Sequence, residues 1–239
     1  MPLLHVERIA KSFGGIQALR GCTFDVDQGS VTGLIGPNGS GKTTMFNVIT
    51  GYTHPESGLV KYHDATIQGQ SPRTIFERGL GRTFQAPRIF GRLSLVENLK
   101  VPTRQGTSHE PSRHRSTEWA EEWLAFVGLA QHRQTMAGAL SYGQRKLLEF
   151  AMVLAAEPDL VLLDEPAGGV NPSMIETMAH LIKETNGRGV TFLVVEHNMG
   201  FVMSLCHHVV VMHQGQVIAD GSPDAIQSNP AVLDAYLGD

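Results

Sequence analysis

Short apolar stretches recur along the chain, and their lengths predict strands rather than helices. Residues 4–13 and 18–26 mix branched and aromatic side chains with polar ones, and a glycine pair at 14–15 separates them. Residues 31–35 and 59–62 are shorter stretches of the same kind. Runs of four to eight such residues bounded by turn residues are typical of strands. We therefore expect the first quarter of the chain to be rich in β-structure.

The second half alternates between strand-like and helical segments. Helical segments separate the first three of its four apolar runs, which predicts a parallel sheet with crossover helices. Between the two halves, residues 95–156 have a helical pattern, and Trp119, Trp123, Leu124 and Val127 recur at the spacing of one buried helix face. The chain is thus expected to be an α/β core with a helical insert at about 86–158. The predicted later strands are 160–163, 191–195, 209–212 and 216–219.

Composition and charge exclude several classes of protein. The 239 residues are 41% hydrophobic and 18% charged, which suits one globular α/β domain and excludes global disorder. The formal net charge of −4 does not suit a strongly basic nucleic-acid binder. Two cysteines, Cys22 and Cys206, are too few for a disulfide framework. No apolar run reaches the roughly 18 residues of a membrane helix, and the first residues lack the pattern of a signal peptide.

A polar stretch between Pro102 and Thr117 interrupts the helical insert. Neither His109 nor His114 has a second potential ligand at a spacing that suits a metal site. We interpret the stretch as an exposed loop with solvated histidines.

A glycine-rich stretch directly after the predicted strand 31–35 carries the strongest chemical signal. It matches G-x-x-x-x-G-K-[ST] and is followed by a helical segment. Its glycines let backbone N–H groups point at phosphate oxygens, Lys42 supplies a charge for the outer phosphates, and the Thr43 hydroxyl suits Mg²⁺. A glycine-rich turn with a chance lysine is the alternative. The residues expected to bind the nucleotide are Gly36, Pro37, Asn38, Gly39, Ser40, Gly41, Lys42, Thr43 and Thr44.

Two carboxylates follow the apolar run 160–163. Asp164 and Glu165 would lie at the carboxyl end of a buried parallel strand, where open α/β sheets bind their ligands. Asp164 suits the Mg²⁺ shell through a bound water. Glu165 then suits polarisation of an attacking water. A strand that simply ends at acidic residues is the alternative, but together with the glycine-rich loop the pair predicts a P-loop NTPase.

The segment Leu-Ser-Tyr-Gly-Gln at 140–144 resembles the L-S-G-G-Q signature of the ATP-binding cassette (ABC) family. The resemblance implies that Ser141 and Gly143 contact the γ-phosphate of ATP bound to the opposite subunit. Tyr142 replaces the usual glycine, and how its side chain is accommodated is open. A polar helix start capped by Ser141 is compatible with the same sequence. The residues implied to contact ATP in trans are Ser141, Tyr142, Gly143 and Gln144.

Other positions resemble further family motifs. Gln85 resembles the Q-loop glutamine that reaches Mg²⁺ and the attacking water, with a plain loop glutamine as the alternative. His197 resembles the switch histidine near the γ-phosphate. Phe13 resembles the aromatic residue that stacks on adenine, and the alternative is a phenylalanine of the hydrophobic core. Asn171 stands where the D-loop commonly has aspartate. Thr43, Gln85 and Asp164, the last through water, are the implied Mg²⁺ contacts.

The resemblance covers nearly the whole chain and implies one ABC ATP-binding domain over 1–239. It implies a P-loop NTPase core at 1–85 and 159–239, with a mostly parallel sheet, an N-terminal antiparallel β portion and a helical subdomain at 86–158. Within the family the chain is most similar to the ATPases of branched-chain and hydrophobic amino-acid uptake systems, with urea and short-amide importers as neighbours. An exporter of the lipopolysaccharide type and a non-transport ABC ATPase are the alternatives.

For an importer, the resemblance implies ATP and Mg²⁺ as ligands and a peripheral location on the cytoplasmic face of the cell membrane. The implied partners are transmembrane permease subunits and a second ATP-binding subunit, identical or related. A periplasmic or extracellular solute-binding protein would be an indirect partner, and nucleic acid is not expected.

Overall fold

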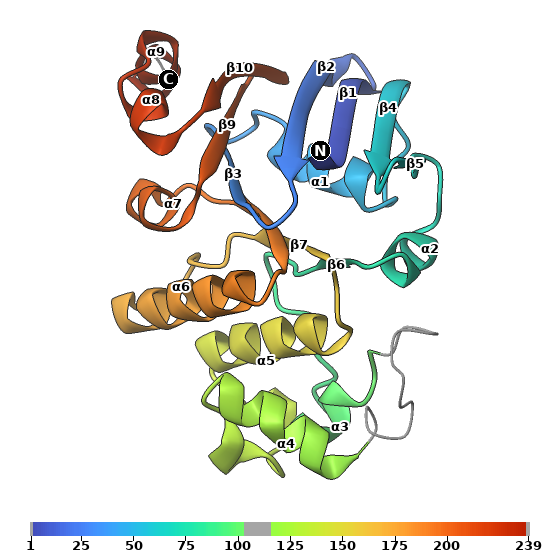
Figure 1. Cartoon of the computed structure of the whole chain (residues 1–239), viewed down its shortest axis with the longest axis vertical. Coiled ribbons are helices and arrows are strands. Elements are labelled where there is room, and N and C mark those ends of the chain that lie inside the picture. Colours follow the sequence, from blue (N-terminus) through green and yellow to red (C-terminus); the bar gives the residue numbers. More distant parts are fainter. Residues whose placement is uncertain (1, 103–115, 238–239) are drawn as a thin grey trace.

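The computed structural model describes residues 2–102 and 116–237. The polar stretch with His109 and His114 lies outside these residues. Figure 1 shows two sheets in the upper part of the molecule and a group of helices at the lower end.

The first sheet is antiparallel, as implied for the N-terminal part of the chain. Its strand order is β2-β1-β4-β5. β1 and β2 form the longest pair, and the sequence prediction missed only the two-residue β5. The four strands are β1 (Pro2–Phe13), β2 (Ile16–Asp27), β4 (Ser57–Tyr62) and β5 (Ala65–Thr66).

The second sheet is mostly parallel and has the order β10-β9-β3-β8-β7-β6. Only β10 runs antiparallel to its neighbour, β9. The prediction of a parallel sheet is confirmed, but the three-residue β6 was missed. The strands are β3 (Val31–Ile35), β6 (Leu80–Arg82), β7 (Leu160–Asp164), β8 (Thr191–Val195), β9 (His208–His213) and β10 (Gln216–Gly221).

Alternate residues of the parallel strands point to two separate apolar clusters. On β7, Leu160 and Leu162 pack with α1 and the antiparallel sheet, whereas Val161 and Leu163 pack with the helices on the other face. A sheet buried on both faces needs continuous apolar strands, which explains the runs seen in the sequence. The helices of the core are α1 (Lys42–Ile49), α2 (Pro72–Glu77), α6 (Pro172–Gly187), α7 (Met199–Leu205), α8 (Pro223–Gln227) and α9 (Pro230–Leu237).

The regular elements described within the predicted helical insert are helices joined by turns, apart from one isolated β-bridge between Ser94 and Met136. Trp119, Leu124 and Val127 are buried and Trp123 is partly buried against the same cluster. The cluster also includes residues of the sheet, so α5 belongs to the packing of both parts (Figure 1). The subdomain boundaries at 86 and 158 therefore stay a prediction. The helices are α3 (Leu95–Leu99), α4 (Thr117–Phe126) and α5 (Tyr142–Ala155), with short 3₁₀ turns at Ala130–His132 and Ala137–Ala139.

No helix in the two described ranges combines the length and the apolar composition needed to cross a membrane.

Candidate active site

The glycine-rich loop joins β3 to the N-terminus of α1, the context that the motif requires. Gly36 has φ 148° and Gly41 has φ 106°. A Cβ atom at Gly36 would lie 2.0 Å from the carbonyl oxygen of Met212, and one at Gly41 would lie 2.6 Å from that of Ala18. Only glycine fits these two positions, because any side chain would collide with backbone. The loop is thus held in a curled shape by its neighbours.

Lys42 lies at the start of α1 with its ammonium turned back into the loop. Its Nζ donates hydrogen bonds of 2.8 Å to the carbonyl oxygens of both Gly36 and Pro37. Burial lowers the pKa of Lys42, and the charges of Glu165 and Asp164 raise it by less. A phosphate that enters the loop can replace the two carbonyls as the partner of this partly desolvated cation. Because hydrogen bonds between charged groups are stronger than those to a neutral carbonyl, this exchange favours binding of the phosphate.

A pocket of about 400 Å³ opens beside this loop. It brings together the start of β2, the loop, the start of α1 and Glu165, which directly follows β7. Phe13 is 52% exposed, so it is not a core residue, and it pairs in register with Ile16, which lines the pocket. Five of the pocket's lining residues were not predicted from the sequence: Ile16, Gln17, Ala18, Arg20 and Gln214. The lining residues are Ile16, Gln17, Ala18, Arg20, Asn38, Gly39, Gly41, Lys42, Thr43, Thr44, Glu165 and Gln214.

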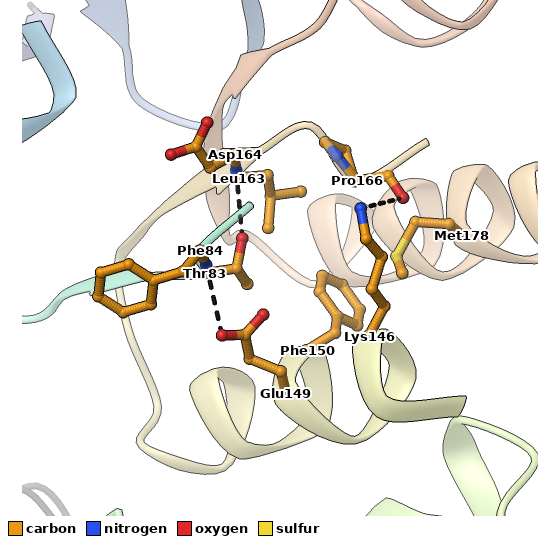
Figure 2. Close-up of a pocket in the computed structure, with 9 residues that line it drawn as sticks. All are labelled: Thr83, Phe84, Lys146, Glu149, Phe150, Leu163, Asp164, Pro166 and Met178. Atoms are coloured by element: carbon orange, nitrogen blue, oxygen red, sulfur yellow. Dashed lines mark hydrogen bonds between the residues drawn. The ribbon is translucent and has the colours of Figure 1, made fainter. Parts of the chain in front are cut away.

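Asp164 ends β7 and forms a buried ion pair with Arg82 of the neighbouring β6. Its Oδ2 lies 3.1 Å from the guanidinium Nη2, and both side chains are at most 7% exposed. The backbone N–H of Asp164 donates to Thr83 Oγ1 at 3.2 Å (Figure 2). Burial raises the pKa of the Asp164 carboxyl, and the charge of Arg82 lowers it by less. The carboxylate is therefore desolvated and fixed in place by one cation.

Glu165 has φ 49°, an uncommon left-handed conformation for a residue with a side chain. Two predicted catalytic residues meet its carboxylate. Gln85 Nε2 donates to Glu165 Oε2 at 3.0 Å, and His197 Nδ1 lies 3.8 Å from Oε1. The structure thus brings together three side chains that lie far apart in the sequence, and Glu165 also lines the pocket that holds Lys42.

Glu196 holds the segment that carries His197. Its side chain is buried, and its Oε1 accepts a hydrogen bond of 2.6 Å from the Ala167 N–H. Oε2 accepts from the N–H groups of His197 and Asn198 at 3.1 and 3.2 Å. No role for Glu196 was predicted from the sequence. The sequence feature that could have indicated this role is the position of the carboxylate directly after an apolar strand.

The signature segment forms the N-terminus of α5. Ser141 is the N-cap: its side chain accepts from the Gln144 N–H, and the Gln144 side chain accepts from the Ser141 N–H. The alternative of a capped helix start is thus confirmed. Among the described residues, the signature does not line the pocket beside Lys42. Its predicted contact with ATP in trans stays a prediction.

Tyr142 and Asn171, the two departures from the family motifs, each have a structural partner. Tyr142 Oη donates to the carbonyl oxygen of Gln85 at 2.9 Å. Asn171 is the N-cap of α6, and its Oδ1 accepts from the Met174 N–H at 2.9 Å. Asparagine and aspartate cap helices about equally well, so this replacement keeps the local structure.

In the described part of the chain, no three His, Cys, Asp or Glu side chains are grouped so that they could hold a metal ion. Mg²⁺ prefers few protein oxygens together with phosphate and water. Thr43 in the pocket and Asp164 at the end of β7 fit this pattern. Gln85, the third predicted Mg²⁺ contact, donates its amide Nε2 to Glu165 Oε2, so it lies beside the residue that follows Asp164.

Comparisons with known proteins agree with this geometry. The ABC transporter family pattern matches residues 19–168, and that of the branched-chain amino acid ATP-binding cassette transporters matches residues 216–239. The chain is 39% identical to the high-affinity branched-chain amino acid transport ATP-binding protein BraF of Pseudomonas aeruginosa. It is 36% identical to LivG of Escherichia coli, and each comparison covers 100% of this chain and 98% of the relative.

Solved structures show the same fold. A nucleotide-free ATP-binding cassette from an ABC transporter matches with a TM-score of 0.89 and 34% identity. An ATP-binding cassette in its ADP conformation matches with a TM-score of 0.88 and 33% identity. Both comparisons cover 100% of each chain. The phosphate-loop geometry, the acidic end of β7 and these likenesses agree: the chain belongs to the ABC transporter family and is one of its ATP-binding cassettes.

Proposed function

We propose that the chain hydrolyses ATP to drive uptake of branched-chain or other hydrophobic amino acids. The observation that carries the ATPase assignment is the meeting of Gln85 and His197 at the carboxylate of Glu165, a residue that also lines the pocket of Lys42. The amino-acid assignment is supported by the relatives' names and by the family match at 216–239. Both favour an importer over the exporter and non-transport alternatives.

Binding begins at the phosphate loop. Its backbone N–H groups and the N-terminus of α1 would surround the β- and γ-phosphates. Lys42 would exchange its bonds to the Gly36 and Pro37 carbonyls for bonds to phosphate oxygens. Phe13 and Ile16, exposed side by side at the β1–β2 turn, offer an apolar surface to the base.

Thr43, Asp164 and Gln85 would hold Mg²⁺, which neutralises charge on the phosphate oxygens during transfer. Asp164 is already fixed by Arg82, so its carboxylate needs little rearrangement. Catalysis by fixed charges benefits from such preorganisation.

Glu165 would polarise the attacking water. Gln85 holds one oxygen of the carboxylate, and His197 lies near the other, where it would contact the γ-phosphate. The signature residues Ser141 to Gln144 would complete the site of a second ATP-binding subunit, identical or related. Closure around ATP would move permease subunits by rigid-body motion. The chain would thus work as a peripheral subunit on the cytoplasmic face of the membrane.

The test is Glu165→Gln, which keeps the shape of the side chain and removes its charge. We expect ATP to bind as in the wild type, hydrolysis to be nearly lost, and a closed dimer to accumulate with ATP, because an unconsumed ligand favours the state that binds it. The readouts are Mg-ATP affinity by calorimetry, phosphate release, and light scattering with and without the partner subunit. Glu176→Gln, an exposed change on α6, is the control. Wild-type hydrolysis by the Glu165 variant would refute the assignment.

The importer assignment is tested separately in cells. Uptake of labelled leucine should require this chain and should be lost with Glu165→Gln but not with Glu176→Gln. Unchanged leucine uptake after deletion of the chain would contradict the amino-acid assignment and leave the ATPase assignment standing.

A further inference from the structure

Helix α5, which begins at the signature, buries two side chains of opposite charge. Lys146 is 5% exposed and Glu149 is 4% exposed. Figure 2 shows them pointing to different segments: Lys146 to the turn after β7, and Glu149 to the segment around Phe84. Charged residues are almost never fully buried without partners. The partners therefore indicate what each side chain does.

The partners of Lys146 are two main-chain carbonyls of the catalytic turn. Its Nζ donates to the carbonyl oxygen of Glu165, and a longer bond of 3.5 Å reaches that of Pro166. The main-chain carbonyl oxygen of Glu165 also accepts a hydrogen bond of 3.0 Å from the Gly168 N–H. A buried ammonium thus holds the turn by its backbone, at the residue whose side chain is proposed to act on water.

The conformation of this turn makes such support necessary. Glu165 has φ 49°, and a left-handed backbone is unfavourable by about 1–2 kcal/mol for a residue with a side chain. Uncommon conformations persist when the surroundings fix them. The Glu165 N–H donates to the Val195 carbonyl at 2.9 Å, so the residue is held at its amide by the sheet and at its carbonyl by α5.

The electrostatic surroundings keep Lys146 in place. Burial lowers the pKa of Lys146, and the nearby acidic residues Glu196, Glu149, Glu165 and Asp164 raise it by less. The two carbonyl oxygens accept from the protonated ammonium, so these hydrogen bonds favour its charged form.

We propose that Lys146 is a positioning residue for ATP hydrolysis: it holds the Glu165 and Pro166 carbonyls and so aims the Glu165 carboxylate at the attacking water. This role presupposes that Glu165 polarises the water. It also gives the signature helix a direct connection to the catalytic turn of its own subunit. Movement of α5 would displace the Lys146 ammonium and with it the backbone of Glu165.

The experiment compares Lys146→Met and Lys146→Arg in the full chain. Methionine keeps an unbranched side chain but cannot donate, whereas arginine keeps the charge and the donors. Lys183→Met, an exposed change on α6, is the control. The readouts are Mg-ATP affinity by calorimetry, single-turnover hydrolysis, and amide hydrogen exchange at Ala167 and Gly168.

For Lys146→Met we expect ATP affinity within about twofold of wild type and hydrolysis slower by about tenfold to hundredfold, since small misplacements of a catalytic group have effects of this size. Lys146→Arg should recover part of the loss, and Lys183→Met should show none. The Gly168 amide should exchange faster in the methionine variant, because the carbonyl that it bonds is no longer held from α5.

A double variant separates positioning from general structural support. In a Glu165→Gln background, Lys146→Met should slow hydrolysis little further, because the carboxylate that it aims is already gone. The proposal would be overturned if the rate losses of Glu165→Gln and Lys146→Met were additive in the double variant. It would also be overturned if Lys146→Met alone kept the wild-type rate and the wild-type exchange at Gly168. If Glu165→Gln itself kept full activity, the proposed function would fail instead, and the exchange measurement alone would decide whether Lys146 holds the turn.

Discussion

Tyr142 Oη donates a hydrogen bond of 2.9 Å to the main-chain carbonyl oxygen of Gln85. The same ring faces Gly169, where a Cβ atom would lie 3.2 Å from Tyr142 Cε1. The tyrosine that departs from the signature pattern thus joins the starts of three segments within one subunit: α5, the loop after β6 and the turn before α6. Glycine, the usual residue, would make neither contact.

Tyr142→Phe tests the contact by removal of one hydroxyl. We expect ATP affinity to be unchanged and the hydrolysis rate to fall about fivefold, since a net hydrogen bond contributes about 1 kcal/mol and the carbonyl belongs to the residue that contacts Glu165. Tyr52→Phe is the control, because its exposed ring packs edge-on against Phe84 in the same region. Phosphate-release kinetics provide the measurement. Equal rates for wild type and Tyr142→Phe would leave Tyr142 without a role in hydrolysis.

The phosphate loop was predictable because its geometry is local: the glycine spacing, the preceding strand and the following helix are all continuous in sequence. The position of Asp164 and Glu165 followed from one rule, that parallel strands end at the same edge of a sheet. These are the parts of the site whose signals do not depend on unknown packing.

The contacts that hold the site were not predictable in the same way. Arg82 reaches Asp164 from β6, a strand of three residues that is too short to give a periodic pattern. Lys146 and Glu149 lie in a helix whose apolar pattern says which face is buried but not which backbone atoms that face meets. Ile16 lines the pocket only because the β1 and β2 register places it opposite Phe13.

Lys42→Ala should weaken Mg-ATP binding by about tenfold to hundredfold, the effect of one charge-assisted contact of roughly 1.5–3 kcal/mol. The variant also leaves the Gly36 and Pro37 carbonyls without their donor, so the free loop should become more mobile. Titration calorimetry measures the affinity, with Lys183→Ala as the charge-matched control. If a folded Lys42→Ala variant bound Mg-ATP as tightly as the wild type, the phosphate loop would not be part of the nucleotide site.

Arg82→Met should lower the free energy of unfolding by about 3–5 kcal/mol, because it leaves the buried Asp164 charge without its partner. The guanidinium also donates to Asn47 and Thr50 and lies 5.0 Å from the Phe84 ring centroid. The control is Arg73→Met in the exposed Arg73–Glu77 pair of α2, where we expect at most about 1 kcal/mol. Urea unfolding followed by circular dichroism measures both.

A second substitution distinguishes lost charge pairing from lost packing at Arg82. If the unpaired charge is the cause, adding Asp164→Asn to Arg82→Met should restore part of the stability, since neither position then carries a buried charge. A double variant that is less stable than Arg82→Met would show that packing around the guanidinium dominates instead.

Glu149 should make the stability of the protein depend on pH in the direction opposite to that of a carboxylate in a surface ion pair. Burial raises the pKa of its carboxyl from 4.5 to about 7, against the lowering effect of the Arg88 and Phe84 N–H groups and of the Lys146 and Arg88 charges. Between these two pH values the folded state keeps a proton that the unfolded state has lost. Stability from this group therefore falls as pH rises through that window and changes little above it.

The measurement is urea unfolding of wild type and Glu149→Gln from pH 5 to pH 8. Glutamine can accept from the same N–H groups but does not titrate, so the wild type should lose roughly 2–3 kcal/mol relative to the variant across this range. Glu176→Gln, exposed on α6, should show no comparable trend. A difference between wild type and Glu149→Gln that stays constant with pH would mean that the carboxyl is ionised in both states. In that case the Lys146 and Arg88 charges would outweigh its burial.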